Sequence, residues 1–164
     1  MLTCDAPCMT DCPAVTIRRY EPKDRAAVID LSSRLAIGVA AWRDPAKVLR
    51  AVRSWIEVSL ASARDDDRAV LVAEVDDRVV GIVTLGERTH FTADVDGYVG
   101  ELVTAEDIEG RGVGRALLTA AEDWARQRGR THLTLETGAQ NTRALSFYRR
   151  SGYADEDLRL TKRI

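Results

Sequence analysis

Hydrophobic and polar positions alternate from Val15 to Tyr20, and this period of two predicts a half-buried strand. The segment that follows, Glu21-Pro22-Lys23-Asp24, is typical of a helix start because proline fits the first helical turn. Gly38 is expected to end that helix, and a second helix is predicted to begin at Asp44-Pro45 with Asp44 as its N-cap. Apolar residues at helical spacing should form the buried faces of the two helices: Val28, Leu31, Leu35, Val48, Val52, Trp55 and Ile56.

Two β-rich runs come next, 69–75 and 79–85, and the short polar joint between them predicts a hairpin. Another strand is expected from Tyr98 to Thr104. The glycine-rich segment after it should open a helix with one apolar face, which Gly129 is placed to end. The residues of that face are Val113, Leu117, Ala120, Ala121 and Trp124.

The last part of the chain predicts a strand, a short helix and an extended tail. Leu133 and Leu135 mark the strand, and the helix is expected over 142–150 with Asn141 as its cap. The tail 153–164 alternates well enough to predict one or two final strands. Together the elements predict one α/β (α+β) domain over residues 15–164, preceded by an extension at 1–14 that we expect to be flexible.

Composition narrows the classes of function. The 164 residues are 45% hydrophobic and 30% charged, as in an ordinary globular protein. The formal net charge is −2 with acids and bases interspersed, so the basic surface that nucleic-acid binding needs is not expected. No apolar run is long enough for a membrane helix, and the first residues lack the pattern of a secretory signal. We therefore expect a cytoplasmic protein that binds neither nucleic acid nor membrane.

All three cysteines, Cys4, Cys8 and Cys12, lie in the first segment. Their spacing would align the thiols on a helix, and three thiolates supply most of the ligands of a zinc site. However, no histidine or fourth cysteine lies nearby, Pro7 and Pro13 interrupt the segment, and an odd number argues against a closed disulfide framework. We interpret the segment as an extension with reduced thiols and expect no metal; metal or redox use is the alternative.

The glycine-rich turn before the long helix is the clearest candidate binding feature. Gly110, Gly112 and Gly114 let the backbone approach a ligand closely, and free N–H groups at a helix start attract anions. Arg111 and Arg115 add positive charge at the same end. The turn is not a P-loop and lacks the full spacing of a dinucleotide fingerprint. By itself, this segment is explained equally well as a tight turn at a helix start that needs glycines for its backbone conformation and binds no ligand.

Several motifs in order favour the first interpretation. The turn, Glu109-Gly110-Arg111-Gly112-Val113-Gly114, is followed by 141–153, Asn-Thr-Arg-Ala-Leu-Ser-Phe-Tyr-Arg-Arg-Ser-Gly-Tyr. These resemble the Gln/Arg-x-x-Gly-x-Gly/Ala and Asn-x-x-Ala-x-x-x-Tyr-x-x-x-Gly-Phe/Tyr motifs of the GNAT superfamily of N-acetyltransferases. Upstream, Asp77-Arg78-Val79-Val80-Gly81 is similar to the family's hairpin between its second and third strands. The resemblance implies a three-layer α/β/α fold with a mixed, mostly antiparallel sheet of six to seven strands and about four helices.

The resemblance also implies acetyl-coenzyme A as cosubstrate, with backbone N–H groups from Gly110 to Arg115 holding its phosphates. Glu109 departs from the family pattern, because a carboxylate cannot donate to the pyrophosphate, so the arginines must screen it. Asn141 is expected to contact the pantetheine or phosphate arm as well as to cap its helix. The backbone of the strand before the turn is implied to hold the acetyl carbonyl and pantetheine, at Leu102, Val103 and Thr104.

The chemistry implied is direct attack of an amine on the thioester, without an acyl-enzyme. Tyr148 matches the family's general acid for the coenzyme A thiolate, and a phenol is protonated at neutral pH; otherwise it is an aromatic packed beneath its helix. Two glutamates are candidates for the general base, Glu136 and Glu101, and each is otherwise a solvent-facing strand residue. Ordered water or a backbone carbonyl could replace either. His90 falls in a loop that could border the acceptor site, although a lone histidine is more often structural.

The function that follows is acetyl transfer to a primary amine on a small molecule, a peptide N-terminus or a protein lysine, with no motif that selects among them. A homodimer is compatible with the family. The alternatives are a catalytically silent acetyl-coenzyme A sensor of the same fold, which would not need Tyr148, and an unrelated nucleotide-binding α/β protein. A purely structural protein would give no reason for three glycines and two arginines at one helix start.

Overall fold

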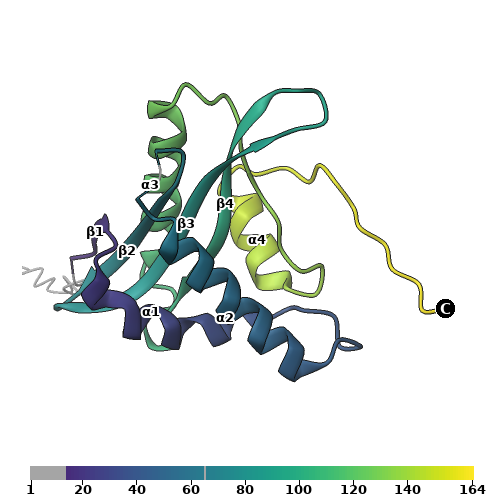
Figure 1. Ribbon diagram of the computed structural model, residues 1–164, viewed down its shortest axis with the longest axis horizontal. Helices are drawn as coiled ribbons and strands as arrows, with labels where there is room; N and C mark the ends of the chain where they lie inside the picture. The colour runs from purple at the N-terminus through teal and green to yellow at the C-terminus, as the bar shows by residue number, and fades with distance from the viewer. Residues whose placement is uncertain (1–13, 65) are drawn as a thin grey trace, which may run out of the picture.

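The computed structural model describes residues 14–64 and 66–164 (Figure 1). The predicted extension at 1–14, with its cysteines, therefore lies outside the described residues except for Ala14. One five-stranded sheet in the order β1-β2-β3-β4-β5 organises the fold. Its strands are β1 (Thr16–Arg19), β2 (Ala69–Val75), β3 (Arg78–Thr89), β4 (Val95–Thr104) and β5 (Leu133–Leu135). Neighbours from β1 to β4 pair antiparallel, and β5 pairs parallel to β4.

Helices cover both faces of this sheet. They are η1 (Pro22–Asp24), α1 (Arg25–Leu31), η2 (Ser32–Ala36), α2 (Pro45–Ala61), η3 (Glu106–Ile108), α3 (Val113–Gln127) and α4 (Thr142–Arg150). The four α-helices start close to their predicted positions, and Asp44 caps α2 by accepting from the Lys47 N–H at 3.0 Å. The first predicted helix is divided into η1, α1 and η2 rather than continuous to Gly38.

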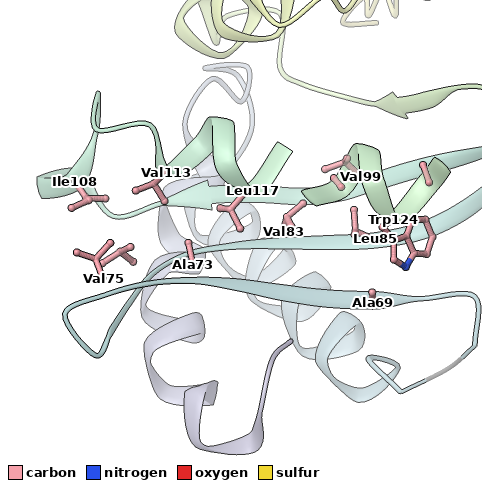
Figure 2. Close-up of a cluster of buried hydrophobic side chains, with 13 residues drawn as sticks. Ala69, Ala73, Val75, Val83, Leu85, Val99, Ile108, Val113, Leu117 and Trp124 are labelled. Atoms are coloured by element: carbon pink, nitrogen blue, oxygen red, sulfur yellow. The ribbon is translucent and has the colours of Figure 1, made fainter. Parts of the chain in front are cut away.

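Alternate residues of the central strands feed two hydrophobic clusters. In β2, Ala69, Ala73 and Val75 pack with α3, whereas Val70 and Val72 pack with α1 and α2 on the opposite face. Figure 2 shows the first of these clusters, in which side chains of α3 lie against those of the sheet. Because side chains along a strand point alternately to the two faces and both sets are apolar here, helices cover both sides, as the predicted three-layer α/β/α fold requires.

Hairpins join β2 to β3 and β3 to β4. The β2–β3 hairpin turns at Asp76 and Asp77, whose φ values of 49° and 58° are the left-handed conformation that two-residue hairpin loops need. The β3–β4 hairpin has longer strands than the predicted 79–85 and 98–104, because β3 continues to Thr89 and β4 begins at Val95. His90 therefore lies at the tip of this hairpin, where its N–H donates to the Asp94 carbonyl at 2.8 Å.

Two predictions about packing are wrong. The sheet has five strands rather than six or seven, because the tail after α4 forms no regular element. Leu158 and Leu160 are 77% and 83% exposed, so their alternation has no sheet surface to cover. Trp55 was predicted to be buried, but it is 54% exposed, since Val52 and Ile56 already occupy the inward face of α2.

Candidate functional site

The sheet opens between β4 and β5. These strands pair from Gly97↔Leu133 to Val99↔Leu135, where β5 ends, while β4 continues to Thr104. Residues 102–104 are therefore paired with β3 on one side and have no β5 partner on the other. The predicted Leu102, Val103 and Thr104 lie along this open edge, which can offer backbone groups to an extended ligand.

A β-bulge at the beginning of the open edge positions Glu101. Gly100 and Glu101 together oppose the single residue Thr84, whose hydroxyl accepts from the Glu101 N–H at 2.9 Å and donates to the Glu101 carboxylate. A side chain at position 100 would place its Cβ 2.7 Å from that hydroxyl oxygen, so only glycine fits. Ser59 of α2 donates to the same carboxylate at 3.3 Å. Glu101 is thus held at a junction of α2, β3 and β4.

Beyond the open edge, the glycine turn leads into α3 with most of its N–H groups free. Gly110 and Gly112 have φ values of 78° and 82°, and Gly112 is the N-cap without a side-chain partner. From Gly110 to Arg115, only the Arg111 N–H donates within the described residues, to the Ile108 carbonyl at 3.3 Å. Because α3 adds its dipole at this end, the turn can bind an anion such as a phosphate.

Gly114 brings three elements together at this turn. A Cβ at this position would lie 3.6 Å from the Phe147 ring of α4 and 4.0 Å from the Thr104 side chain at the end of β4. The first turn of α3, the end of the open edge and α4 therefore meet around the glycine turn.

Tyr148, the predicted acid, follows Phe147 on α4. Burial raises the pKa of Tyr148 to about 12, so the phenol is protonated at neutral pH. Its ring lies 5.2 Å from that of Phe147 and 5.9 Å from that of Tyr153. The Tyr148 hydroxyl makes no hydrogen bond within the described part of the chain, and the Tyr153 hydroxyl is buried without a partner there. Tyr148 thus keeps a proton that no protein acceptor uses.

Glu136 lies in a different environment from Glu101. It comes directly after β5, is exposed, and accepts from Arg88 of β3 at 2.8 Å. This hydrogen bond raises the pKa of the exposed Arg88 guanidinium. The two glutamates that the sequence proposed for the same role are therefore held by separate partners.

Asn141 caps α4 and also contacts the chain between η2 and α2. Its Oδ1 accepts from the Ala144 N–H at 3.1 Å, and its Nδ2 donates to the Ile37 carbonyl at 3.4 Å. Gly38 has a φ of 83°, and a Cβ there would lie 2.4 Å from the Asn141 Cβ. The chain between η2 and α2 thus reaches the loop that precedes α4. Its amino-acid sequence predicted only a helix end at Gly38.

Glu109 joins this segment to α4. One carboxylate oxygen pairs with Arg34 of η2 and the other with Arg143 of α4. Arg34 also donates to the Thr104 carbonyl at 2.9 Å and approaches Glu106 at 3.2 Å. Sequence reasoning missed Arg34, Ser59 and Thr84, which come from elements remote along the chain. Arg143 lies inside the recognised motif 141–153, and its place in that motif could have identified it as a site residue from the sequence.

Other chemistry finds less support in the described residues. No group of three or more His, Cys, Asp and Glu side chains in the described ranges is arranged to hold a metal ion, and the cysteines lie outside those ranges. His90 approaches Glu156 at 3.6 Å, and His132 approaches Asp96 at 3.7 Å. None of the described helices combines the length and apolarity needed to cross a membrane.

Comparison with known proteins connects this geometry to a family. The model of the acetyltransferase (GNAT) family matches residues 34–153. An uncharacterized N-acetyltransferase of Methanocaldococcus jannaschii is 32% identical over 110 residues, which are 62% of this chain and 47% of that protein. The aminoalkylphosphonate N-acetyltransferase of Salmonella typhimurium is 36% identical over 87 residues, 52% of this chain and 56% of the relative. The chain thus spans about half the length of the curated relatives it matches.

The fold agrees with solved structures. The PaiA N-acetyltransferase of Thermoplasma acidophilum, solved in complex with coenzyme A, superimposes with a TM-score of 0.75 at 18% identity, covering 89% of this chain and 93% of that one. An identity this low establishes the shared fold only. The family match extends from η2 to Tyr153, three residues after the end of α4, and includes the open edge, the glycine turn and Tyr148. The chain belongs to the GNAT acetyltransferase family.

Proposed function

We propose that the protein transfers an acetyl group from acetyl-coenzyme A to a primary amine by direct attack of that amine. The observation that carries the proposal is the set of free N–H groups of the glycine turn beside the open edge of β4. An anion site beside an unpaired strand edge suits a ligand that has phosphates at one end and an amide-bearing arm at the other.

The residues present fit this cosubstrate. N–H groups between Gly110 and Arg115 would hold the phosphates, and Arg111 and Arg115 are exposed at the same turn. Backbone groups of 102–104 would hold the pantetheine arm and the acetyl carbonyl, and Asn141 at the start of α4 would contact the pantetheine or phosphate arm. The cosubstrate supplies an activated thioester.

The reaction must balance one bond formed and one broken. The amine nitrogen forms a bond to the acetyl carbon while the carbon–sulfur bond breaks and its electrons leave with sulfur. The nitrogen gives up a proton, and the departing thiolate takes one. Tyr148 is proposed to donate the latter, because its raised pKa keeps the phenol protonated and its hydroxyl has no competing acceptor in the described chain.

Glu101 is the better supported of the two candidate bases. It lies at the bulge where the open edge begins, partly buried and oriented by Thr84 and Ser59. Glu136 is exposed and already paired with Arg88. A base must be held close to the reacting nitrogen, which favours an oriented carboxylate inside the opening. Glu101 could accept the amine proton directly or through water.

The acceptor is proposed only as far as its reacting group, a primary amine. The name of the Salmonella typhimurium relative specifies an aminoalkylphosphonate, and that of a solved Arabidopsis thaliana structure specifies glucosamine-6-phosphate. These acceptors differ in size and charge but share an amino group. A small molecule, a peptide N-terminus and a protein lysine are all consistent with the proposal.

Two measurements on the purified protein test it. Calorimetry with coenzyme A should detect uptake, and a panel of amines should release free thiol from acetyl-coenzyme A above the rate without acceptor. Uptake without thiol release from any amine would favour the sensor alternative. Absence of uptake would overturn the assignment of the glycine turn and with it the transferase proposal.

A further inference from the structure

Glu109 places a negative charge next to the proposed phosphate site, where the family usually carries glutamine or arginine. Uncompensated, this carboxylate would repel a diphosphate held by the glycine turn. Its two oxygens instead pair with two arginines from different layers, Arg34 and Arg143. Because Arg34 also approaches Glu106, the arrangement balances two arginines against two carboxylates and so compensates the charge of Glu109.

Arg34 is fully used by the protein. Its Nε donates to the Thr104 carbonyl at 2.9 Å, one terminal nitrogen approaches Glu106 at 3.2 Å and the other pairs with Glu109. The side chain is mostly buried at 21% exposure. Arg34 thus fixes the carboxylate of Glu109 relative to the end of β4 and has no nitrogen left for a ligand.

Arg143 is used only in part. Its side chain is 69% exposed and its single hydrogen bond in the described chain is the one from Nη1 to Glu109. A guanidinium has five N–H donors in a planar fork that suits phosphate oxygens. The remaining donors of Arg143 are therefore available to a ligand.

The position of α4 brings this guanidinium to the glycine turn. Arg143 and Phe147 are four residues apart and share one face of α4. Phe147 meets Gly114 in the first turn of α3, and Arg143 meets Glu109 immediately before the turn. Two independent contacts thus set this face of α4 against the segment whose free N–H groups would receive the phosphates.

We infer that Arg143 is a phosphate-binding residue for the coenzyme, held at the glycine turn by Glu109, which Arg34 fixes in turn. The inference rests on the proposed function. The cation absent from position 109 is supplied from α4, and Glu109 acts as a positioning residue rather than as a ligand. Either the diphosphate or the ribose 3′-phosphate of the coenzyme can be the group that Arg143 contacts.

Calorimetry with truncated ligands tests the inference and separates the two phosphates. In Arg143→Gln, the dissociation constant for coenzyme A should rise by roughly 10- to 100-fold, as expected for a lost charge-assisted contact. An equal loss for dephospho-coenzyme A identifies the diphosphate, and no loss for that ligand identifies the 3′-phosphate. Pantetheine, which has no phosphate, should bind both proteins alike, and Arg143→Lys should recover part of the affinity.

A control variant is available on the same helix. Arg150 is also exposed but lies at the other end of α4, where it donates to Ser146, so Arg150→Gln should leave coenzyme A affinity unchanged. The unfolding temperature of each variant shows whether the fold is retained. A folded Arg143→Gln that binds coenzyme A like the wild type overturns the inference while the proposed function stands. Wild-type protein that takes up no coenzyme A overturns both.

The role of Glu109 is tested by a double-mutant cycle. If Glu109 positions Arg143, the effect of Arg143→Gln on coenzyme A affinity should be several-fold smaller in a Glu109→Gln background. If Glu109 instead competes with the phosphates for Arg143, that effect should be larger in the same background, and the positioning role is wrong.

Discussion

Tyr148 and Tyr153 are neighbouring phenols with ring centroids 5.9 Å apart, and only Tyr148 is proposed to act as an acid. Burial raises the pKa of both, to about 12 for Tyr148. The Tyr153 hydroxyl is buried without a partner in the described chain, which costs stability. Tyr148 can give its proton to a departing thiolate. At the residue scale, the pair allows the acid assignment to be tested against a neighbour of the same type.

Tyr148→Phe should lower kcat by about 10²-fold or more, because it removes the proposed acid without removing the ring. Thiol release from acetyl-coenzyme A, measured with saturating acceptor, reports this loss. Because the phenol can act only when it is protonated, ionisation of Tyr148 should lower the wild-type rate only as the pH rises towards about 12. Tyr153→Phe is the matched control and should keep kcat within about 3-fold. Unchanged turnover in Tyr148→Phe would remove the acid assignment.

Glu101→Gln and Glu136→Gln should separate the two candidate bases. We expect the first to lower kcat/KM at neutral pH by about 10²-fold, because it removes an oriented carboxylate from the bulge. The second should change it by less than about 3-fold, since Glu136 is an exposed partner of Arg88. The measurement is initial-rate thiol release at several acceptor concentrations. The reverse order of effects would transfer the role of base to Glu136.

At the scale of elements, close backbone approaches determine which segments meet. The chain after η2 reaches the loop before α4 because Gly38 has no Cβ to strike Asn141. Gly100 does the same for the bulge, where it leaves room for the Thr84 hydroxyl. Such glycines are recognisable only once the partner segment is known, since the sequence around Gly38 signals no more than a helix end and that around Gly100 no more than a strand.

Gly38→Ala should lower the free energy of unfolding by about 3 kcal/mol, from a strained φ plus overpacking against Asn141. Gly129→Ala measures the cost of the strained φ alone, because Gly129 has a similar φ of 70° and open space around it. We expect it to cost about 1 kcal/mol. Urea unfolding of the two variants gives the comparison. Equal losses would show that the contact between Gly38 and Asn141 contributes nothing to stability.

Elements with local signals could be predicted from the sequence, and those that depend on distant partners could not. The caps Asp44 and Asn141 and the β-rich runs 69–75 and 79–85 were sufficient to locate α2, α4 and the central strands. The tail after α4 alternates as well, but a strand also needs an edge to pair with. The same division holds in the site: the glycine turn and Tyr148 lie in local motifs, whereas Arg34 is recognised only through its contacts with Thr104 and Glu109.

At the scale of the whole molecule, a charge cluster ties the start of the chain to the sheet. Arg18 of β1 donates to the buried Asp24 of η1 at 2.7 and 2.9 Å, and to Glu74 of β2. The hydrogen bond from Arg18 lowers the pKa of Asp24 below its ordinary value of 3.8. Asp24 therefore contributes stability above pH ~4 that is lost as the pH falls through its lower, folded-state pKa.

Asp24→Asn should accordingly flatten the acid limb of the stability curve. We expect it to lower the free energy of unfolding at pH 7 by about 2 kcal/mol, with a smaller difference from wild type below pH ~3. Denaturant unfolding at several pH values measures both. Asp107→Asn is the control, because the pKa of Asp107 is also lowered, by Arg78, but the pair is exposed. A constant difference between Asp24→Asn and wild type at every pH would contradict the linkage.

The contacts of Arg34 have a consequence for how the binding of one substrate would affect the affinity for the other. This one side chain joins the segment between the first two helices to the end of β4 and to the glycine turn. A ligand that stiffens the turn would therefore also restrain the segment between the first two helices. Thermodynamic reciprocity requires that whatever affinity the amine gains from coenzyme already in place, the coenzyme gains equally from the amine. Any such mutual gain in affinity would then pass through a single guanidinium.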